Sequence, residues 1–325
     1  MDPVSQPGAS GAPATRRRTL LTALAAATAG APLLAQLGGT PAYAATTPPP
    51  DGPPAPGAEY FTNNHLYRHL AGREGIDFGR RYKRHELTDT ELPNRFPYAR
   101  TTVMALHGGG IEMGTSELCL GIAGYDPGTL KAEPGVATYD YWMFEGLRSA
   151  SAPDGQKNAD LHVTAQNCDD HVALSMAASS LNVLSLHGCK AEQIPFITNL
   201  TWPPKEIDPK AVVVGGLSTP LREALVAELR AAGFQAIDAM KPQESGVESL
   251  GHLNGDHTNN PCNRTMLRQG AQLEMTYELR ASLFGDFSTR SSRASSWKDT
   301  KARFIPFRDA CRRAIATVEA TQPIL

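Results

Sequence analysis

The sequence lacks a strong charge of either sign. Its 325 residues carry 31 lysines and arginines against 33 aspartates and glutamates, a net charge of −2, and these charges form no long block. Such a chain has no electrostatic footprint for nucleic acid, so a nucleic-acid partner is not expected. An anionic substrate would have to be held by a local basic pocket, because the global field is too weak to steer it.

Cysteine is scarce, and its spacing excludes one class of site. The chain has five cysteines and no CxxC pair: Cys119, Cys168, Cys189, Cys262 and Cys311. A zinc site built from cysteine is therefore disfavoured. An odd number of cysteines in an exported chain allows one or two disulfides with a spare thiol, and the spacing does not say which cysteines pair.

The N-terminal apolar stretch is not the run of about 20 strongly apolar residues that a membrane anchor needs. It follows three arginines at 16–18, is broken by Gly30 and Pro32, and ends in Ala-Tyr-Ala at 42–44. This pattern predicts a cleavable export signal of the twin-arginine type over residues 1–44. The mature protein is then expected to be secreted, with no stable membrane span.

The predicted mature chain begins with a proline-rich linker. Residues 45–57 contain TTPPPDGPPAPG, a stiff segment without core-forming side chains. The removed signal carries three arginines and one aspartate, so the mature chain has a net charge of −4. The remaining length suits one large domain.

Apolar strand patterns alternate with helical patterns along this domain. Strands are predicted over residues 101–109, 139–147, 159–166, 181–189 and 270–280, the last as a strand or a strand–helix junction. Helices are predicted from residue 115, capped by Thr115 or Ser116, and over 169–180. Residues 211–240 have the pattern of strand, helix and strand. The alternation predicts an α/β fold with a mixed, mostly parallel sheet flanked by helices.

Two histidines lie at the carboxyl ends of predicted strands, where such sheets bind ligands. Three glycines separate His107 from Glu112, and His187 repeats the apolar–His–Gly pattern. The glycine loop lets His107 and Glu112 face one ion, and His187 can approach from a neighbouring strand. Two histidines and a glutamate, with a position left for water, form a known ligand set for catalytic zinc. A carboxylate outside this set is needed as a general base, and Glu274 is the candidate.

Other roles for these residues stay open. A strand-end histidine often serves only as a hydrogen-bonding residue of the fold. The HGGG motif also builds lipase oxyanion holes, but this chain has no Gly-x-Ser-x-Gly elbow, so a serine hydrolase is set aside. Glu117 and the Asp169-Asp170 pair are assigned to helix starts. His162 either orients a metal ligand from outside the ligand set or packs in the cleft.

Several sequence blocks resemble the poly-γ-glutamate hydrolase family. They run from about Tyr60 to about Phe287 in the family's order: ALHGGGIEMGTSELCLGIAG, YDYWMFEGL, LHVTAQNCDD, LSLHGC and NRTMLRQGAQLEMTYELR. The family includes phage enzymes that depolymerise bacterial poly-γ-glutamate, and it is similar in fold to the carboxypeptidase A group of zinc peptidases. The resemblance implies a zinc hydrolase domain over 58–287 and a C-terminal extension, linker plus helix, over 288–325.

The resemblance also implies roles for matching residues. One zinc ion would be held by His107, Glu112 and His187, with Glu274 as the general base. Substrate carboxylates would be bound by Asn263, Arg264 and Arg280, for which ordinary surface salt bridging is the alternative.

The expected activity is secreted, zinc-dependent cleavage of γ-glutamyl amide bonds in poly-γ-glutamate. One alternative is a zinc peptidase or amidase that acts on γ-D-glutamyl links of cell-wall peptides. Another is a non-catalytic binding protein on a degenerate peptidase scaffold. That last alternative predicts a missing ligand or base, whereas all four residues are present.

Overall fold

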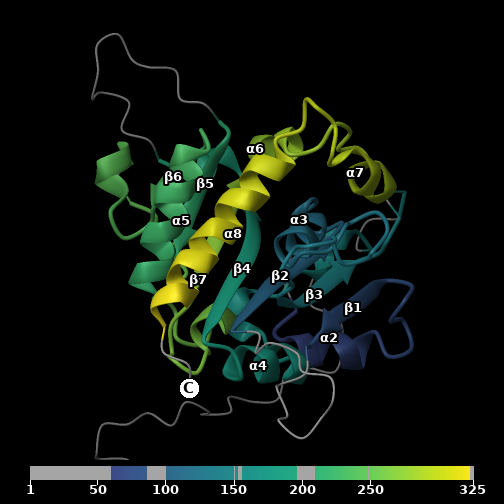
Figure 1. Ribbon diagram of the computed structural model, residues 1–325. Coiled ribbons are helices and arrows are strands. Elements are labelled where there is room, and N and C mark those ends of the chain that lie inside the picture. The colour runs from purple at the N-terminus through teal and green to yellow at the C-terminus, as the bar shows by residue number, and fades with distance from the viewer. Residues whose placement is uncertain are drawn as a thin grey trace, which may run out of the picture. The chain divides into compact units, whose positions relative to one another are not determined.

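The computed structural model describes residues 60–85, 100–149, 151–152, 156–195, 209–247 and 249–322 (Figure 1). The predicted export signal and linker lie outside these residues. The described residues all belong to the unit Pro49–Leu325. Within them, no helix combines the length and the apolar character that crossing a membrane would require.

A seven-stranded sheet forms the centre of the fold, in the order β1-β3-β2-β4-β7-β5-β6. The strands are β1 Phe78–Lys83, β2 Thr101–Gly109, β3 Asp140–Gly146, β4 Asn182–Cys189, β5 Ala211–Gly215, β6 Gln235–Asp238 and β7 Ala271–Thr276. Strands β3, β2, β4 and β7 run parallel to one another, as do β5 and β6, whereas β1 and β5 are antiparallel to their neighbours β3 and β7. The predicted mixed, mostly parallel sheet is confirmed.

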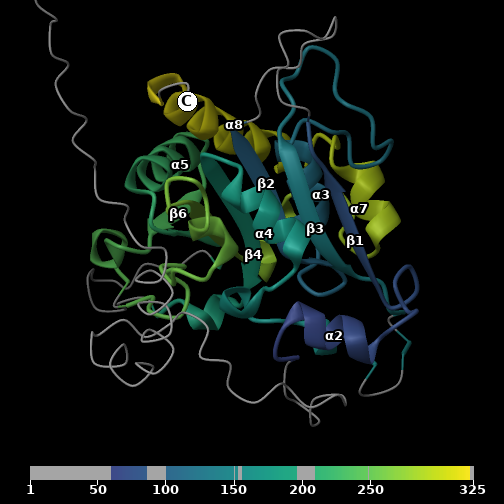
Figure 2. The ribbon, with the colours of Figure 1, turned by 90° about the horizontal axis from the view of Figure 1, so that it is seen from below.

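Helices cover both faces of this sheet. They are α2 Asn63–His69, α3 Thr115–Ile122, α4 His171–Ala178, α5 Thr219–Ala231, α6 Tyr277–Ser282, α7 Arg290–Ser296 and α8 Phe304–Thr321. Successive strand residues point to opposite faces, so Val103 packs with α3, α5 and α8, whereas Met104 packs with α2 and α4. Figure 2 shows α8 and α2 on opposite sides of the strands. Both faces are therefore apolar, which explains the continuous apolar runs of β2 and β4.

One predicted strand is wrong. Residues 159–166 form no strand but two 3₁₀ turns, η2 Asn158–Leu161 and η3 Ala165–Asn167. Leu161 and Val163 are buried in the apolar cluster beneath α4, and His162 between them is only partly buried. The alternation of apolar and polar residues was therefore real, but it belongs to a connection laid along the core without a partner strand.

The start of α3 also differs from its prediction. The residue that precedes the helix is Gly114, at φ +95°, rather than Thr115 or Ser116. Ser116 instead accepts a hydrogen bond from the backbone N–H of Gly109 at 2.8 Å. Its hydroxyl therefore holds the glycine turn against α3 instead of capping the helix.

The C-terminal residues pack against the sheet. Helix α8 buries Phe304, Phe307, Ala314 and Ile315 completely, within the same apolar cluster as α3 and α5. It crosses the sheet face in front of β4 and β7 in Figure 1. The segment predicted as a linker and helix thus contributes two helices, α7 and α8, of which α8 supplies much of one core layer.

The five cysteines are all buried and free. The one or two disulfides that the sequence left open do not form in this structure.

Candidate metal centre

The glycine turn after β2 brings the first two polar residues of the site together. The backbone N–H of Glu112 donates to the carbonyl of His107 at 2.8 Å, which closes the turn. Gly109 has φ +65°, and a Cβ there would collide with the carbonyl oxygen of Gly146 on β3. The turn therefore requires glycine at this position, because the backbone of β3 cannot move away from it.

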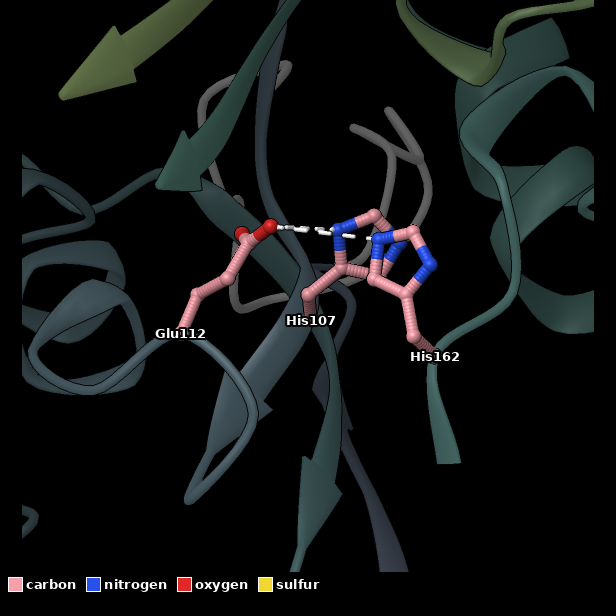
Figure 3. Close-up of side chains that lie close together, drawn as sticks. All are labelled: His107, Glu112 and His162. Atoms are coloured by element: carbon pink, nitrogen blue, oxygen red, sulfur yellow. Dashed lines mark hydrogen bonds and ion pairs between the residues drawn. The ribbon is translucent and has the colours of Figure 1, made fainter. Parts of the chain in front are cut away.

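His107, Glu112 and His162 converge on one point (Figure 3). Glu112 Oε1 lies 3.1 Å from His107 Nδ1 and 4.0 Å from His162 Nε2. One ligand atom from each residue lies within 4.8 Å of the others, so the three side chains could hold a metal ion. The imidazole rings of His107 and His162 are stacked at an angle, with centroids 3.9 Å apart.

His187 approaches the same point from β4. Its Nδ1 lies 3.2 Å from His107 Nδ1 and 3.9 Å from Glu112 Oε2. The backbone N–H of the next residue, Gly188, donates to Glu112 Oε2 at 2.8 Å. Parallel pairing of β2 with β4 produces this approach, since both strands end at the same edge of the sheet.

The outer nitrogens of His107 and His187 have defined partners. His107 Nε2 lies 2.8 Å from the carbonyl oxygen of Val163, so it carries the proton and donates. The Nδ1 of a neutral His107 then has its lone pair directed at the cluster. His187 Nε2 pairs with Ser185 Oγ at 2.8 Å, and its Nδ1 faces that of His107. Two imidazole nitrogens so close need a proton or a cation between them, and outer hydrogen bonds of this kind are usual around metal-ligating histidines.

Glu274 lies beside this cluster on β7. Strand pairing places it directly opposite His187, and Gln272 Nε2 donates to its Oε1 at 3.1 Å. Burial, and next the charge of Glu112, raise the pKa of Glu274 well above its usual range, while Arg280 opposes this shift. A buried carboxylate with a raised pKa is a stronger base than a carboxylate in water.

The histidines affect the other titratable groups. Burial alone would raise the pKa of Glu112, but the neighbouring histidines, when they are protonated, outweigh burial and lower this pKa to about 2, with His107 contributing most. Burial, followed by the charge of His107, lowers the pKa of His187 to about 3. An ionised carboxylate therefore faces neutral His187, which is the protonation state that metal ligation requires.

Residues 82–309 match the family model described as poly-gamma-glutamate hydrolase. The chain belongs to the poly-γ-glutamate hydrolase family. This membership confirms the resemblance seen in the sequence blocks.

Relatives of known sequence include two proteins of Bacillus subtilis (strain 168). The UPF0714 protein YndL is 31% identical over 190 residues, which are 58% of this chain and 58% of YndL. The UPF0714 protein YmaC is 28% identical over 189 residues, which are 58% of this chain and 62% of YmaC. The match thus spans less than two thirds of either relative.

Two solved structures share the fold of this hydrolase-family chain. A bacteriophage poly-gamma-glutamate hydrolase superposes with a TM-score of 0.57 at 22% identity, over 82% of this chain and all of that one. A zinc-free apo form of YndL superposes with a TM-score of 0.56 at 26% identity, over 80% of this chain and 98% of that one.

The candidate metal site of this family member opens into a cavity of about 570 Å³, here called the catalytic cavity. Glu274 and Gln272 line one wall, and the 3₁₀ segment from His162 to Gln166 lines another. The described lining residues include no lysine or arginine, and their acidic members are Glu112, Glu274 and Asp256. An anionic polymer in this cavity would therefore meet carboxylates and histidines, not arginines.

The residues predicted to bind substrate carboxylates are not among the described residues that line this cavity, although Asn263 and Arg280 adjoin it. Asn263 uses its amide to bond four backbone groups, the N–H groups of Leu217 and Gly270 and the carbonyls of Gly255 and His257. Arg264 is not among the residues that line the cavity.

Arg280 is mostly buried, with 7% of its surface exposed. It donates to the carbonyls of Met113 and Met275 at 2.7 and 3.2 Å, and so braces the backbone behind Glu112 and Glu274.

His162 lies beside the cluster, as one of the two roles considered from the sequence would have it, whereas Gln272 and Ser185 were not anticipated. The signal for His162 was its place between two buried residues, Leu161 and Val163, which turns its side chain toward the cavity. Gln272 and Glu274 are two residues apart on one strand, so they share a face of β7. The same spacing puts Ser185 and His187 on one face of β4.

Proposed function

We propose that this protein is a zinc-dependent hydrolase of γ-glutamyl amide bonds in poly-γ-glutamate. The observation that carries the proposal is the convergence of His107, Glu112 and His187 within 3.9 Å, with Glu274 opposite His187 on the adjacent strand. Family membership supports the reaction class, and the name of the family supports the polymer.

We further propose His107, Glu112 and His187 as the zinc ligands. Bond lengths of about 2.1 Å in a tetrahedral site put any two ligand atoms about 3.4 Å apart. His107 Nδ1 lies 3.1 Å from Glu112 Oε1 and 3.2 Å from His187 Nδ1, and His187 Nδ1 lies 3.9 Å from the other carboxylate oxygen, Oε2. His162 Nε2 is 4.0 Å from Glu112 Oε1, nearly the same separation, so the choice of His187 over His162 rests on its 3.2 Å approach to His107 Nδ1.

The donor set of two imidazoles and one carboxylate, with outer hydrogen bonds on both histidines, fits zinc. When bound there, zinc would lower the pKa of a water molecule and polarise the scissile carbonyl. Glu274 takes a proton from the attacking water and delivers it to the leaving amine. Gln272 fixes the direction of the Glu274 carboxylate during this transfer.

A Glu274→Gln variant tests the assignment of the base. It should keep zinc in stoichiometric amount and lose about a hundredfold to ten-thousandfold in kcat, since it retains the shape but cannot accept the proton. Zinc is measured by atomic emission, and turnover by the chain length of poly-γ-glutamate products. Glu244→Gln, an exposed carboxylate on the far edge of the sheet, is the matched control and should behave as the parent does. Retained turnover by Glu274→Gln would place the base elsewhere.

The parent protein tests the substrate. Cleavage of poly-γ-glutamate that stops on chelation and returns with zinc is expected. Cleavage of γ-D-glutamyl cell-wall peptides with no action on the polymer would favour the alternative substrate. Binding of the polymer without turnover by a zinc-loaded parent would favour a non-catalytic binding protein.

We propose secretion through the twin-arginine route as the setting for this activity, and detection of a mature N-terminus after Ala44 in the culture medium would test it.

A further inference from the structure

A second cavity lies on the other side of the glycine turn. It has a volume of about 510 Å³ and is lined by residues from four parts of the chain, within 109–113, 146–149, 157–159 and 288–293. Four of its lining side chains are basic, namely Arg148, Lys157, Arg290 and Arg293, and none of the described lining residues is acidic. We call this cavity the basic groove.

The basic groove and the catalytic cavity share their walls. Along the turn, His107 and Glu112 face the catalytic cavity, whereas Gly109, Gly110 and Met113 face the basic groove. The 3₁₀ turn η2 and the residue after it also lie between the two cavities, because Asn158 and Ala159 line the basic groove and His162 lines the catalytic cavity. The two cavities are therefore neighbours, and a polymer chain long enough to leave one could enter the other.

The floor of the basic groove is held by paired hydrogen bonds. The side chain of Asn158 accepts from the backbone N–H of Arg148 at 2.9 Å and donates to its carbonyl at 2.8 Å. The guanidinium of Arg148 donates to the carbonyl of Lys157 at 3.2 Å, and its contact with Asp77 is long, at 3.8 Å. The position of Arg148 is thus fixed by hydrogen bonds to its backbone and from its guanidinium, as well as by its contact with Asp77.

The charge on the opposite wall is only partly compensated. Arg290 bonds Glu145, but the same carboxylate is shared with Arg81, so two guanidinium groups face one carboxylate. The side chain of Arg290 is 48% exposed, whereas that of Glu145 is 1% exposed. A solvent-filled groove with this wall presents positive charge to a ligand and keeps the neutralising carboxylate beneath the surface.

We propose that the basic groove binds the carboxylates of the same polymer chain that is cut in the catalytic cavity. This inference rests on the proposed function. Poly-γ-glutamate carries one carboxylate in each residue, and the catalytic cavity has no described lysine or arginine to offset them. The groove supplies that positive charge on residues beyond the cut, so it favours long chains over short ones. Lys157 and Arg290 are binding residues here, and they do not touch the reacting bond.

Binding of the polymer to non-hydrolysing protein tests the proposal directly. The parent for this test is the zinc-loaded Glu274→Gln protein, to which the changes Lys157→Gln and Arg290→Gln are added. Both side chains are exposed, so the fold should be kept. The expected result is a rise of about fivefold or more in the Kd for long poly-γ-glutamate, with a weaker dependence of Kd on salt. The rise should be smaller for a γ-linked glutamate trimer.

A matched control removes the same charge at the other end of the sheet. Lys241→Gln with Arg313→Gln changes two exposed cations beside α5, and its Kd for the polymer should equal that of the parent. An unchanged Kd in the groove variant, or an equal change for polymer and trimer, would overturn the proposal and leave the proposed function intact. If the folded, zinc-loaded wild-type protein neither bound nor cut poly-γ-glutamate, the proposed function and the groove would both be wrong.

Discussion

The choice between His187 and His162 as the third zinc ligand leads to a quantitative prediction. Zinc bound by a four-ligand protein site contributes about 10 to 16 kcal/mol, or about 2.5 to 4 kcal/mol for each ligand. Replacing a true ligand by alanine should therefore weaken zinc binding roughly 70- to 900-fold. Loss of a residue next to the ligands typically weakens it by about 10- to 100-fold. Because the Nδ1 of His187 lies 3.2 Å from that of His107, we expect the larger loss for His187→Ala.

Competition with a chromogenic chelator measures both affinities on the same scale. Ser185→Ala is a useful third variant, because it removes only the hydroxyl next to His187 Nε2 and should fall in the range of neighbouring residues. Circular dichroism of each zinc-free variant checks that the fold is kept. A larger loss in His162→Ala than in His187→Ala would refute the reasoning from ligand separations, and His162 would then be the ligand.

Two further predictions concern stability. Arg293 and Glu117 form a buried ion pair at 3.0 Å, so Arg293→Met should lower the free energy of unfolding in urea by about 3 kcal/mol or more at neutral pH. Adding Glu117→Gln to this variant should recover part of the lost stability, because the carboxylate left unpaired is then removed. If the losses of the two single variants simply add in the double variant, the pair does not stabilise the fold. Burial raises the pKa of Glu319 above 4.5, against the hydrogen bond from Thr101, so folding favours its protonated form. The stabilisation from Glu319 is fully present below the pKa that its carboxyl has in the unfolded chain. It is lost as the pH rises through the higher pKa of the folded protein. Glu319→Gln should thus gain stability over the parent above that range in pH-dependent unfolding, and a constant difference at all pH values would contradict this.

The parts of the fold that could be predicted from sequence are those with local causes. Strands β2 and β4 are buried on both faces, so each reads as a continuous apolar run, and the glycine turn links His107 to Glu112 directly. The segment around His162 was misjudged, because alternation reports burial and not pairing.

Other features depend on contacts between distant segments. The opposition of His187 and Glu274 needs the strand order, which the local pattern does not give. The basic groove combines Arg148, Lys157 and Arg290 from three segments that only the folded chain brings together.

The position of β7 has a consequence for how this protein folds. It is the last of the described strands in the chain, yet it lies between β4 and β5 near the middle of the sheet. Until residues 271–276 are made, the earlier strands can pair only as two separate ribbons, β1 to β4 and β5 with β6. Closure of the sheet and completion of the site are then one event, because the strand that joins the ribbons also carries Glu274. Pairings so distant in sequence fold slowly, so the proposed activity is expected to appear only after β7 has been made and has paired with both ribbons.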